Sequence, residues 1–283
     1  MERPVLGAWL IQFCTMGVTL SYGIFQDFYT TTQLNNHSPA VISVIGGTQI
    51  FLTFALGPVS GRLFDSCYTR TAFTSGSLLY VLSFLMLSFV EPSQWSQAFL
   101  AQGVGMGLGA GLLCLPSYAV AAEHFKSRRG LITGIVQSGS AFGGVVFSII
   151  LNHLFRGPFA VGFGWGTRDT TLIVMNLLIL GNLLIFVPPR PPLLSPSSPS
   201  VATIRDTPFL ITLAWAFVTL IGLYFPLFYI QTFARMNGPY NLAFYSPAIL
   251  NAAGILGCLL PHLAANQIGT LRVLVPVTII SGE

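Results

Sequence analysis

Long apolar segments without a charged residue are the feature that most constrains what this chain can fold into. Eight of them run for 18 to 23 residues and contain no Lys, Arg, Asp or Glu; they are residues 5–26, 39–61, 72–90, 98–120, 130–151, 170–187, 208–230 and 244–264. A helix of about 20 apolar residues crosses a bilayer, whereas strands of a membrane barrel are about ten residues long and alternate in polarity. Charged residues make up only 7% of the chain, against about a quarter in soluble domains. The sequence therefore predicts an all-α fold, a polytopic helical bundle in a lipid bilayer.

A Pro- and Ser-rich segment separates the first six apolar segments from the later ones. It starts at residue 188 with the sequence PPRPPLLSPSSPS, a composition that does not form a packed helix. A ninth apolar segment begins near residue 273 and runs to Glu283. Six helices on each side of a linker are typical of membrane proteins built from two repeated halves. We therefore expect a complete six-helix N-terminal lobe in residues 1–187, a cytoplasmic linker in 188–207, and a partial C-terminal lobe in 208–283 with spans seven, eight and the start of nine.

The basic residues lie mostly on one side of the predicted membrane. Nine of the 12 Lys and Arg residues fall on the side of the N-terminus, namely Arg3, Arg62, Arg70, Lys126, Arg128, Arg129, Arg190, Arg205 and Arg272; Arg156, Arg168 and Arg235 fall on the other. Cytoplasmic loops are enriched in Lys and Arg, so we expect the N-terminus in the cytoplasm. The net charge of +4 then reflects membrane orientation, and it does not indicate a nucleic-acid partner.

Cysteine and histidine give no sign of a metal or a catalytic centre. Cys14, Cys114 and Cys258 lie in apolar segments and Cys67 in a polar turn, and no two have metal-ligand or CxxC spacing. None of the four histidines has an acidic residue or a second histidine three or four positions further on. We therefore expect no metal and no cofactor. Because the apolar segments contain no acidic or basic residue, we also expect that the protein is not an enzyme.

A short polar turn between the second and third segments carries most of the charge of this region. The stretch GPVSGRLFDSCYTR contains Gly61, Arg62, Asp65 and Arg70. Glycine lets helices approach closely, and a carboxylate can pair with arginines or with a helix N-terminus. A polar turn with arginines placed by membrane orientation alone is the simpler interpretation. The residues and their position nevertheless resemble the loop signature of the major facilitator superfamily, which implies that these four residues form a gating loop that latches one face.

Further stretches resemble the monocarboxylate transporter family of that superfamily, in its fungal-type branch. They are SYGIFQDFYT at 21–30, GPVSGRLFD at 57–65, the Gly-rich stretch 102–144 and NAAGILG at 251–257. The resemblance runs from about Gly7 to Gly269. It implies a twelve-helix, two-lobed carrier in the plasma membrane that moves small organic anions by alternating access, often together with a proton.

Polar residues inside the apolar segments are the candidate contacts of such a solute. Gln12, Thr15, Thr19, Tyr22 and Gln26 recur at steps of three and four residues, which places them on one helix face. Because a polar stripe facing lipid is unfavourable, they must face protein or water. For the threonines we expect hydrogen bonding between helices. For Tyr22, Gln26 and Gln137, hydrogen bonding between helices and lining of a solute cavity are equally good interpretations. Asn251 and Cys258, in the eighth segment, complete the substrate-binding candidates.

The chain departs from the family pattern where an anion would bind. The resemblance places an arginine at the position of Cys258 and, in the animal branch, a lysine at the position of Gln26, so a carboxylate would depend on neutral donors unless an arginine such as Arg235 reached the cavity. Against the family pattern, we expect the chain to end within span nine, without spans ten to twelve. Our leading hypothesis is a transporter of small organic solutes, monocarboxylate-like, with proton coupling as an option. The alternative is a truncated, transport-incompetent relative with a scaffold or regulatory role.

Overall fold

The computed structural model describes residues 3–125, 129–157, 160–186, 206–238, 240–268 and 272–273. Every regular element in these ranges is a helix. Within the described residues, seven helical stretches are long and apolar enough to cross a membrane. The prediction of an all-α, multi-pass membrane bundle is therefore confirmed. Most of the expected linker and of the ninth segment lies outside the described residues.

The helices follow the apolar segments closely in chain order. They are α1 (Arg3–Leu20), α2 (Tyr22–Phe28), η1 (Tyr29–Gln33), α3 (Pro39–Ala55), α4 (Gly57–Asp65), α5 (Thr69–Leu87), α6 (Trp95–Ala98), η2 (Phe99–Met106), α7 (Gly107–His124), α8 (Arg129–Arg156), α9 (Phe163–Leu184), α11 (Thr207–Asn237) and α12 (Tyr240–Ile268), with η1 and η2 in π-helical geometry. The first span runs on from α1 through α2 and η1, and the second from α3 through α4.

Several helices run beyond the predicted apolar segments and include charged residues at their ends. The helix of the sixth predicted segment, α9, begins at Phe163 rather than at the predicted residue 170, so it includes Arg168 and Asp169. Arg168 is accommodated because its guanidinium lies over the rings of Phe89 and Trp165, at 4.4 and 4.8 Å from their centroids. Cation–π contacts of this kind favour an arginine at a helix end. Uncharged length alone therefore underestimates how far these helices run.

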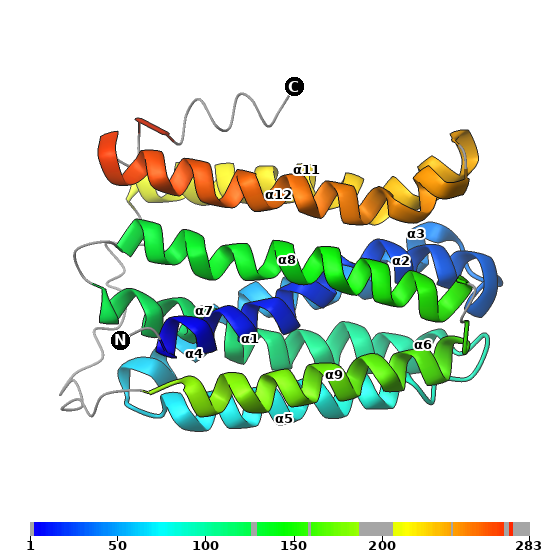
Figure 1. Cartoon of the computed structure of the whole chain (residues 1–283), viewed down its shortest axis with the longest axis horizontal. Coiled ribbons are helices and arrows are strands. Elements are labelled where there is room, and N and C mark those ends of the chain that lie inside the picture. Colours follow the sequence, from blue (N-terminus) through cyan, green and yellow to red (C-terminus); the bar gives the residue numbers. More distant parts are fainter. Residues whose placement is uncertain are drawn as a thin grey trace.

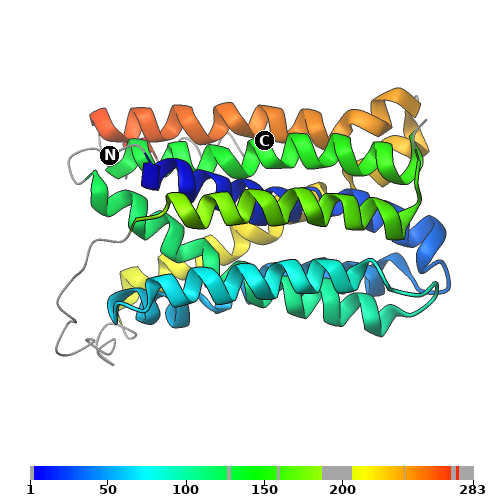
Figure 2. The ribbon, with the colours of Figure 1, turned by 60° about the horizontal axis from the view of Figure 1, so that its bottom comes forward.

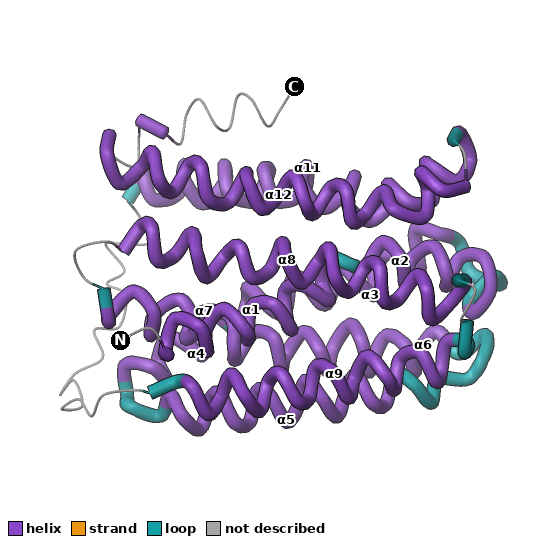
Figure 3. The backbone as a smooth tube through the Cα atoms, in the orientation of Figure 1, coloured by secondary structure: helices purple, strands orange, loops and turns teal. Residues whose placement is uncertain are grey.

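The helices run side by side along one axis of the molecule (Figure 1). α11 and α12 form one side, α5 and α9 form the opposite side, and α8 lies between α1 and α12, packing against both. A view turned by 60° keeps α8 beside α12 and α9 beside α1 (Figure 2). We call the end where α1 and α8 begin the N-terminal face, and the end where α2, α8 and α11 finish the far face. The tube drawing shows that nearly all connections lie at these two ends (Figure 3).

Glycine sets how closely α1 and α8 approach. A Cβ atom added to Gly143 would lie 2.9 Å from the Cα of Gly17 and would overlap the carbonyl oxygen of Phe13. One turn earlier, a Cβ on Gly139 would lie 2.6 Å from the carbonyl oxygen of Trp9. Small residues allow backbones in a membrane to pack directly against each other. The expected packing role of the glycines is thus realised at the contact that joins α1 to α8.

A valine at Gly143 should force α1 and α8 apart. We expect Gly143→Val to lower the free energy of unfolding in detergent by about 2 kcal/mol or more, because a clash with backbone atoms cannot be relieved by a rotamer change. Thermal unfolding monitored by circular dichroism measures this. Gly47→Val is the matched control, since Gly47 also lies inside a helix and a Cβ there meets no atom within 4 Å. Equal losses for the two variants would show that helix propensity, not packing, sets the effect.

Candidate functional site

A buried carboxylate at the far face joins three helices. Asp27 of α2 is 1% exposed and forms salt bridges with Arg156 of α8, at 3.0 Å, and with Arg235 of α11. Arg156 also donates to the Asp27 carbonyl oxygen at 3.2 Å and to the Thr31 hydroxyl. The side chains of the two arginines are 21% and 29% exposed. We call these three residues, Asp27, Arg156 and Arg235, the ion cluster.

A second buried polar pair adds α12 to the same contact. Asn152 of α8 donates to the carbonyl oxygen of Phe244 at 2.7 Å, and its own side-chain oxygen accepts from the Gln231 amide at 2.8 Å. Asn152 and Gln231 are 1% and 2% exposed. A buried hydrogen bond in a low dielectric is strong, and an unpaired polar group there is costly. The far ends of α8, α11 and α12 are therefore fixed relative to one another.

Aromatic and glycine contacts close the far face between α2 and α11. The Tyr22 and Phe228 rings lie 4.6 Å apart, and a Cβ on Gly23 would lie 2.7 Å from the Leu227 carbonyl oxygen. The Tyr229 hydroxyl reaches the carbonyl oxygen of Pro39 at 3.4 Å. We call Tyr22, Gly23, Leu227 and Phe228 the far-face seal.

Two of the predicted cavity residues lie in or beside this seal. The Tyr22 hydroxyl donates to the Ile42 carbonyl oxygen at 2.9 Å, and the Gln26 amide donates to that of Pro39 at 3.0 Å. Both side chains are essentially buried, and the Gln26 Oε1 atom has no hydrogen-bond partner among the described residues. Both contacts join α2 to α3. The structure thus places Tyr22 and Gln26 between helices at the far face.

α11 is exposed along most of its length, and its few buried residues lie close together. Its buried residues are Leu227, Phe228 and Gln231, all in the C-terminal half. In the N-terminal half, Ile211, Phe217 and Val218 are 64%, 65% and 67% exposed. α11 packs against α2 and α12. It is therefore sealed to the first helices near the far face, and most of its length is uncovered by the described residues.

A group of neutral polar side chains lies deeper in the bundle. The Tyr118 hydroxyl of α7 donates to the Gln137 Oε1 atom of α8 at 3.1 Å. Cys258 of α12 and Tyr224 of α11 lie in the neighbourhood of Tyr118. We call Tyr118, Gln137, Tyr224 and Cys258 the central group. It brings together Gln137 and Cys258, which the sequence singled out, and adds two tyrosines that the search for polar stripes missed.

The fifth candidate, Asn251, packs tightly against α8. Its amide donates to the Pro247 carbonyl oxygen at 2.9 Å, and a Cβ on Gly144 would lie 2.5 Å from its side chain. Asn251 is 4% exposed. The structure thus places it in the α8–α12 contact.

The predicted gating loop lies at the N-terminal face, in α4 and at the start of α5. Gly61 brings α4 close to α7, since a Cβ there would lie 3.3 Å from a methyl group of Leu115. Arg62, Asp65 and Arg70 are exposed, and no salt bridge to another described residue is formed by any of them. Within the described residues, no three His, Cys, Asp or Glu side chains gather as metal ligands would.

Removing the charge of Asp27 should loosen the far-face seal. In a chain with Cys67 and Cys258 replaced by serine, Phe228→Cys provides a buried thiol at the seal. We expect Asp27→Asn to raise the rate of its labelling by an impermeant maleimide about tenfold, since a close buried charge pair contributes roughly 1.5 kcal/mol or more and 1.4 kcal/mol is a factor of ten in the open population.

Asp169→Asn is the control for that measurement. Asp169 is exposed and forms no salt bridge with a described residue, so its substitution should leave the labelling rate unchanged. A rate unaffected by Asp27→Asn would mean that the ion cluster does not hold the seal.

Comparison with known proteins agrees with this helical arrangement. The family model described as Major Facilitator Superfamily matches residues 8–282. The chain is 33% identical to the agnestins efflux protein AgnL12 of Paecilomyces divaricatus, over 98% of this chain and 63% of that protein. It is 34% identical to the aspyridones efflux protein apdF of Emericella nidulans, over 98% and 55%, and 33% identical to the MFS-type transporter hasB of Aspergillus fumigatus, over 98% and 64%.

The chain thus spans between 55% and 64% of the length of these three relatives. The family match covers nearly all of this chain. Its relatives are named as transporters and efflux proteins, not as enzymes. The chain belongs to the Major Facilitator Superfamily.

Proposed function

We propose that this chain carries small organic solutes across a membrane by alternating access, in the direction of export. The observation that carries the proposal is the closed far face, where the ion cluster and the far-face seal hold α2 and α8 to α11. A carrier that works by alternating access closes one face while the other is open. The names of two relatives, which are efflux proteins, support export over uptake.

The contacts of the far face suggest how such a carrier would switch. The ion cluster and the far-face seal join α2 and α8 to α11, and the Asn152 bonds add α12. Opening this face requires all of them to separate together, which favours two discrete arrangements over a continuous motion. We propose that residues 1–187 move as one lobe against the part of a second lobe in 208–283, joined by the linker 188–207.

The gating loop would act at the other face. Asp65, Arg62 and Arg70 are exposed in the present arrangement, as a latch would be when its face is open. When the N-terminal face closes, Asp65 can pair with a cation or a helix N-terminus brought near by the moving lobe. We propose that the loop favours that closed state and that it does not contact the solute.

The expected orientation in the membrane supports export as the direction of transport. The sequence predicts nine of the 12 basic residues on the side of the N-terminus, and we propose that this side, the N-terminal face, is cytoplasmic. The plasma membrane is the proposed location. The arrangement in the structure would then admit solute from the cytoplasm, and opening of the far-face seal would release it outside.

The central group bears on the class of solute. Tyr118, Gln137, Tyr224 and Cys258 offer hydroxyl, amide and thiol groups and no fixed charge. Arg235, an alternative anion partner, is paired with Asp27. We therefore propose neutral or weakly held organic solutes as the main substrates. Monocarboxylates moving with a proton are the finer hypothesis, and they would depend on neutral donors alone.

Transport by the purified chain tests the proposal directly. In proteoliposomes we expect exchange of labelled lactate, or of its neutral analogue lactamide, above the rate of protein-free vesicles. Asp65→Asn should lower the turnover severalfold with little change in the half-saturation concentration, because the latch acts on the conformational step. A change in half-saturation alone would contradict the latch. Absence of exchange for both probes would contradict transport and favour a scaffold or regulatory role.

Restoring a cation in the central group should change solute preference. We expect Cys258→Arg to strengthen binding of lactate about tenfold and to weaken binding of lactamide, because an arginine pairs with a carboxylate but is buried unpaired beside a neutral solute. Equilibrium dialysis with both solutes measures this. Cys258→Ser is the control, since it changes the same atom without adding charge. Tight and selective lactate binding by the unmodified chain would contradict the idea that an anion site is missing.

A further inference from the structure

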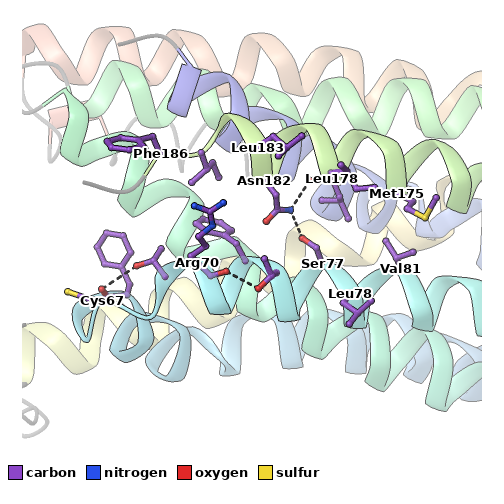
Figure 4. Close-up of a pocket in the computed structure, with 16 residues that line it drawn as sticks. Cys67, Arg70, Ser77, Leu78, Val81, Met175, Leu178, Asn182, Leu183 and Phe186 are labelled. Carbon is purple, nitrogen blue, oxygen red and sulfur yellow. Dashed lines mark hydrogen bonds between the residues drawn. The ribbon is translucent and has the colours of Figure 1, made fainter. Parts of the chain in front are cut away.

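A groove of about 730 Å³ lies between α5 and α9, near the N-terminal face (Figure 4). It is lined on the α5 side by Arg70, Ser77 and Val81, and on the α9 side by Leu178, Asn182 and Leu183, among others. Its size is within the range of 300–1,000 Å³ that is typical of small-molecule sites. We call it the α5/α9 groove.

The α5/α9 groove is separate from the proposed solute path. α5 and α9 form the side of the molecule opposite α11 and α12 (Figure 1). No member of the far-face seal or of the central group lines it. α5 is itself one of the helices long and apolar enough to span a membrane. The groove therefore faces the bilayer and not the contact between the two halves.

The lining has one charged end and an otherwise apolar wall. Arg70 is exposed and forms no salt bridge with a described residue. Ser77 and Asn182 lie deeper, and the Asn182 amide donates to the Ser77 hydroxyl at 2.8 Å, so these polar groups satisfy each other. Leu183 at the rim is 73% exposed. Arg70 is thus the charged lining residue that is left for a ligand.

We propose that the α5/α9 groove binds one anionic glycerophospholipid. The phosphate group would lie at Arg70, at the start of α5 near the N-terminal face, and an acyl chain would lie along Val81 and Leu178. An arginine binds a phosphate with charge-assisted hydrogen bonds, and basic pockets between membrane helices recognise anionic headgroups. The charge at one end and the apolar wall beyond it match the two parts of such a lipid.

Lipid binding to the purified full-length chain tests this proposal. Native mass spectrometry with added palmitoyl-oleoyl phosphatidylglycerol or phosphatidylcholine counts the lipids retained. We expect one phosphatidylglycerol to be retained in preference to phosphatidylcholine, and Arg70→Gln to reduce that preference about fivefold, the effect of one cation beside an anionic headgroup. Arg3→Gln, a change of an exposed arginine at the same face outside the groove, should leave the preference unchanged.

A second pair of variants tests the apolar wall. Leu183→Trp places a bulky ring in the groove from its rim and should reduce retention of both lipids. Leu172→Trp is the control, because Leu172 is also exposed on α9, at 54%, but lies outside the groove. Equal retention of the two lipids by the unmodified chain, no retention of either, or equal effects of Arg70→Gln and Arg3→Gln would overturn the proposal.

Discussion

The pairing of Asp27 with two arginines is the interaction on which the placement of α11 depends. A carboxylate that is 1% exposed within a membrane protein has neither water nor lipid headgroups to solvate it. It must therefore be paired by the protein itself, and the partners come from α8 and α11. This charge, together with the far-face seal and the Asn152–Gln231 bond, fixes the end of α11 that contacts the first helices.

The composition of the ion cluster also fits a contact that has to open. One carboxylate between two arginines leaves an excess positive charge, and both arginine side chains are partly exposed. Breaking a fully buried pair leaves an uncompensated charge and is strongly unfavourable, whereas an arginine at the membrane edge can turn toward water or headgroups. The two arginines can thus be solvated when α11 moves away. The Asp27 carboxylate is solvated only if water enters.

Hydropathy predicted the helices well because the bilayer imposes their length and composition. The positions of charge were harder to place. Asp27 follows directly after the first apolar segment, so counting uncharged residues leaves it outside the membrane, whereas α2 and η1 continue the helix to Gln33. What keeps Asp27 inside is a pair of partners 129 and 208 residues away along the chain, and no local pattern contains that information.

For the candidate site residues, too, local sequence patterns predicted burial but not the helices that the residues contact. Steps of three and four residues predicted one buried polar face in the first span, and Gln12, Thr15, Thr19, Tyr22 and Gln26 are all buried. Periodicity does not say which helix that face meets. The amide of Gln12 bonds Ser117 of α7 and that of Gln26 bonds Pro39 of α3, so one stripe serves two different neighbours. Tyr118 and Tyr224 were missed because neither belongs to the polar stripe recognised in the first segment.

The distribution of charge bears finally on how this chain could select a solute. The charged groups described here lie toward the ends of the helices, at Asp27, Arg156 and Arg235 on one face and at Arg62, Asp65 and Arg70 on the other. The central group between those ends is neutral. Charges at the two faces can bias which face is closed, and a neutral interior then discriminates among solutes by shape and hydrogen bonding. Rejection of a molecule that leaves a buried donor unpaired is a strong form of such discrimination, and it requires no fixed ion at membrane depth.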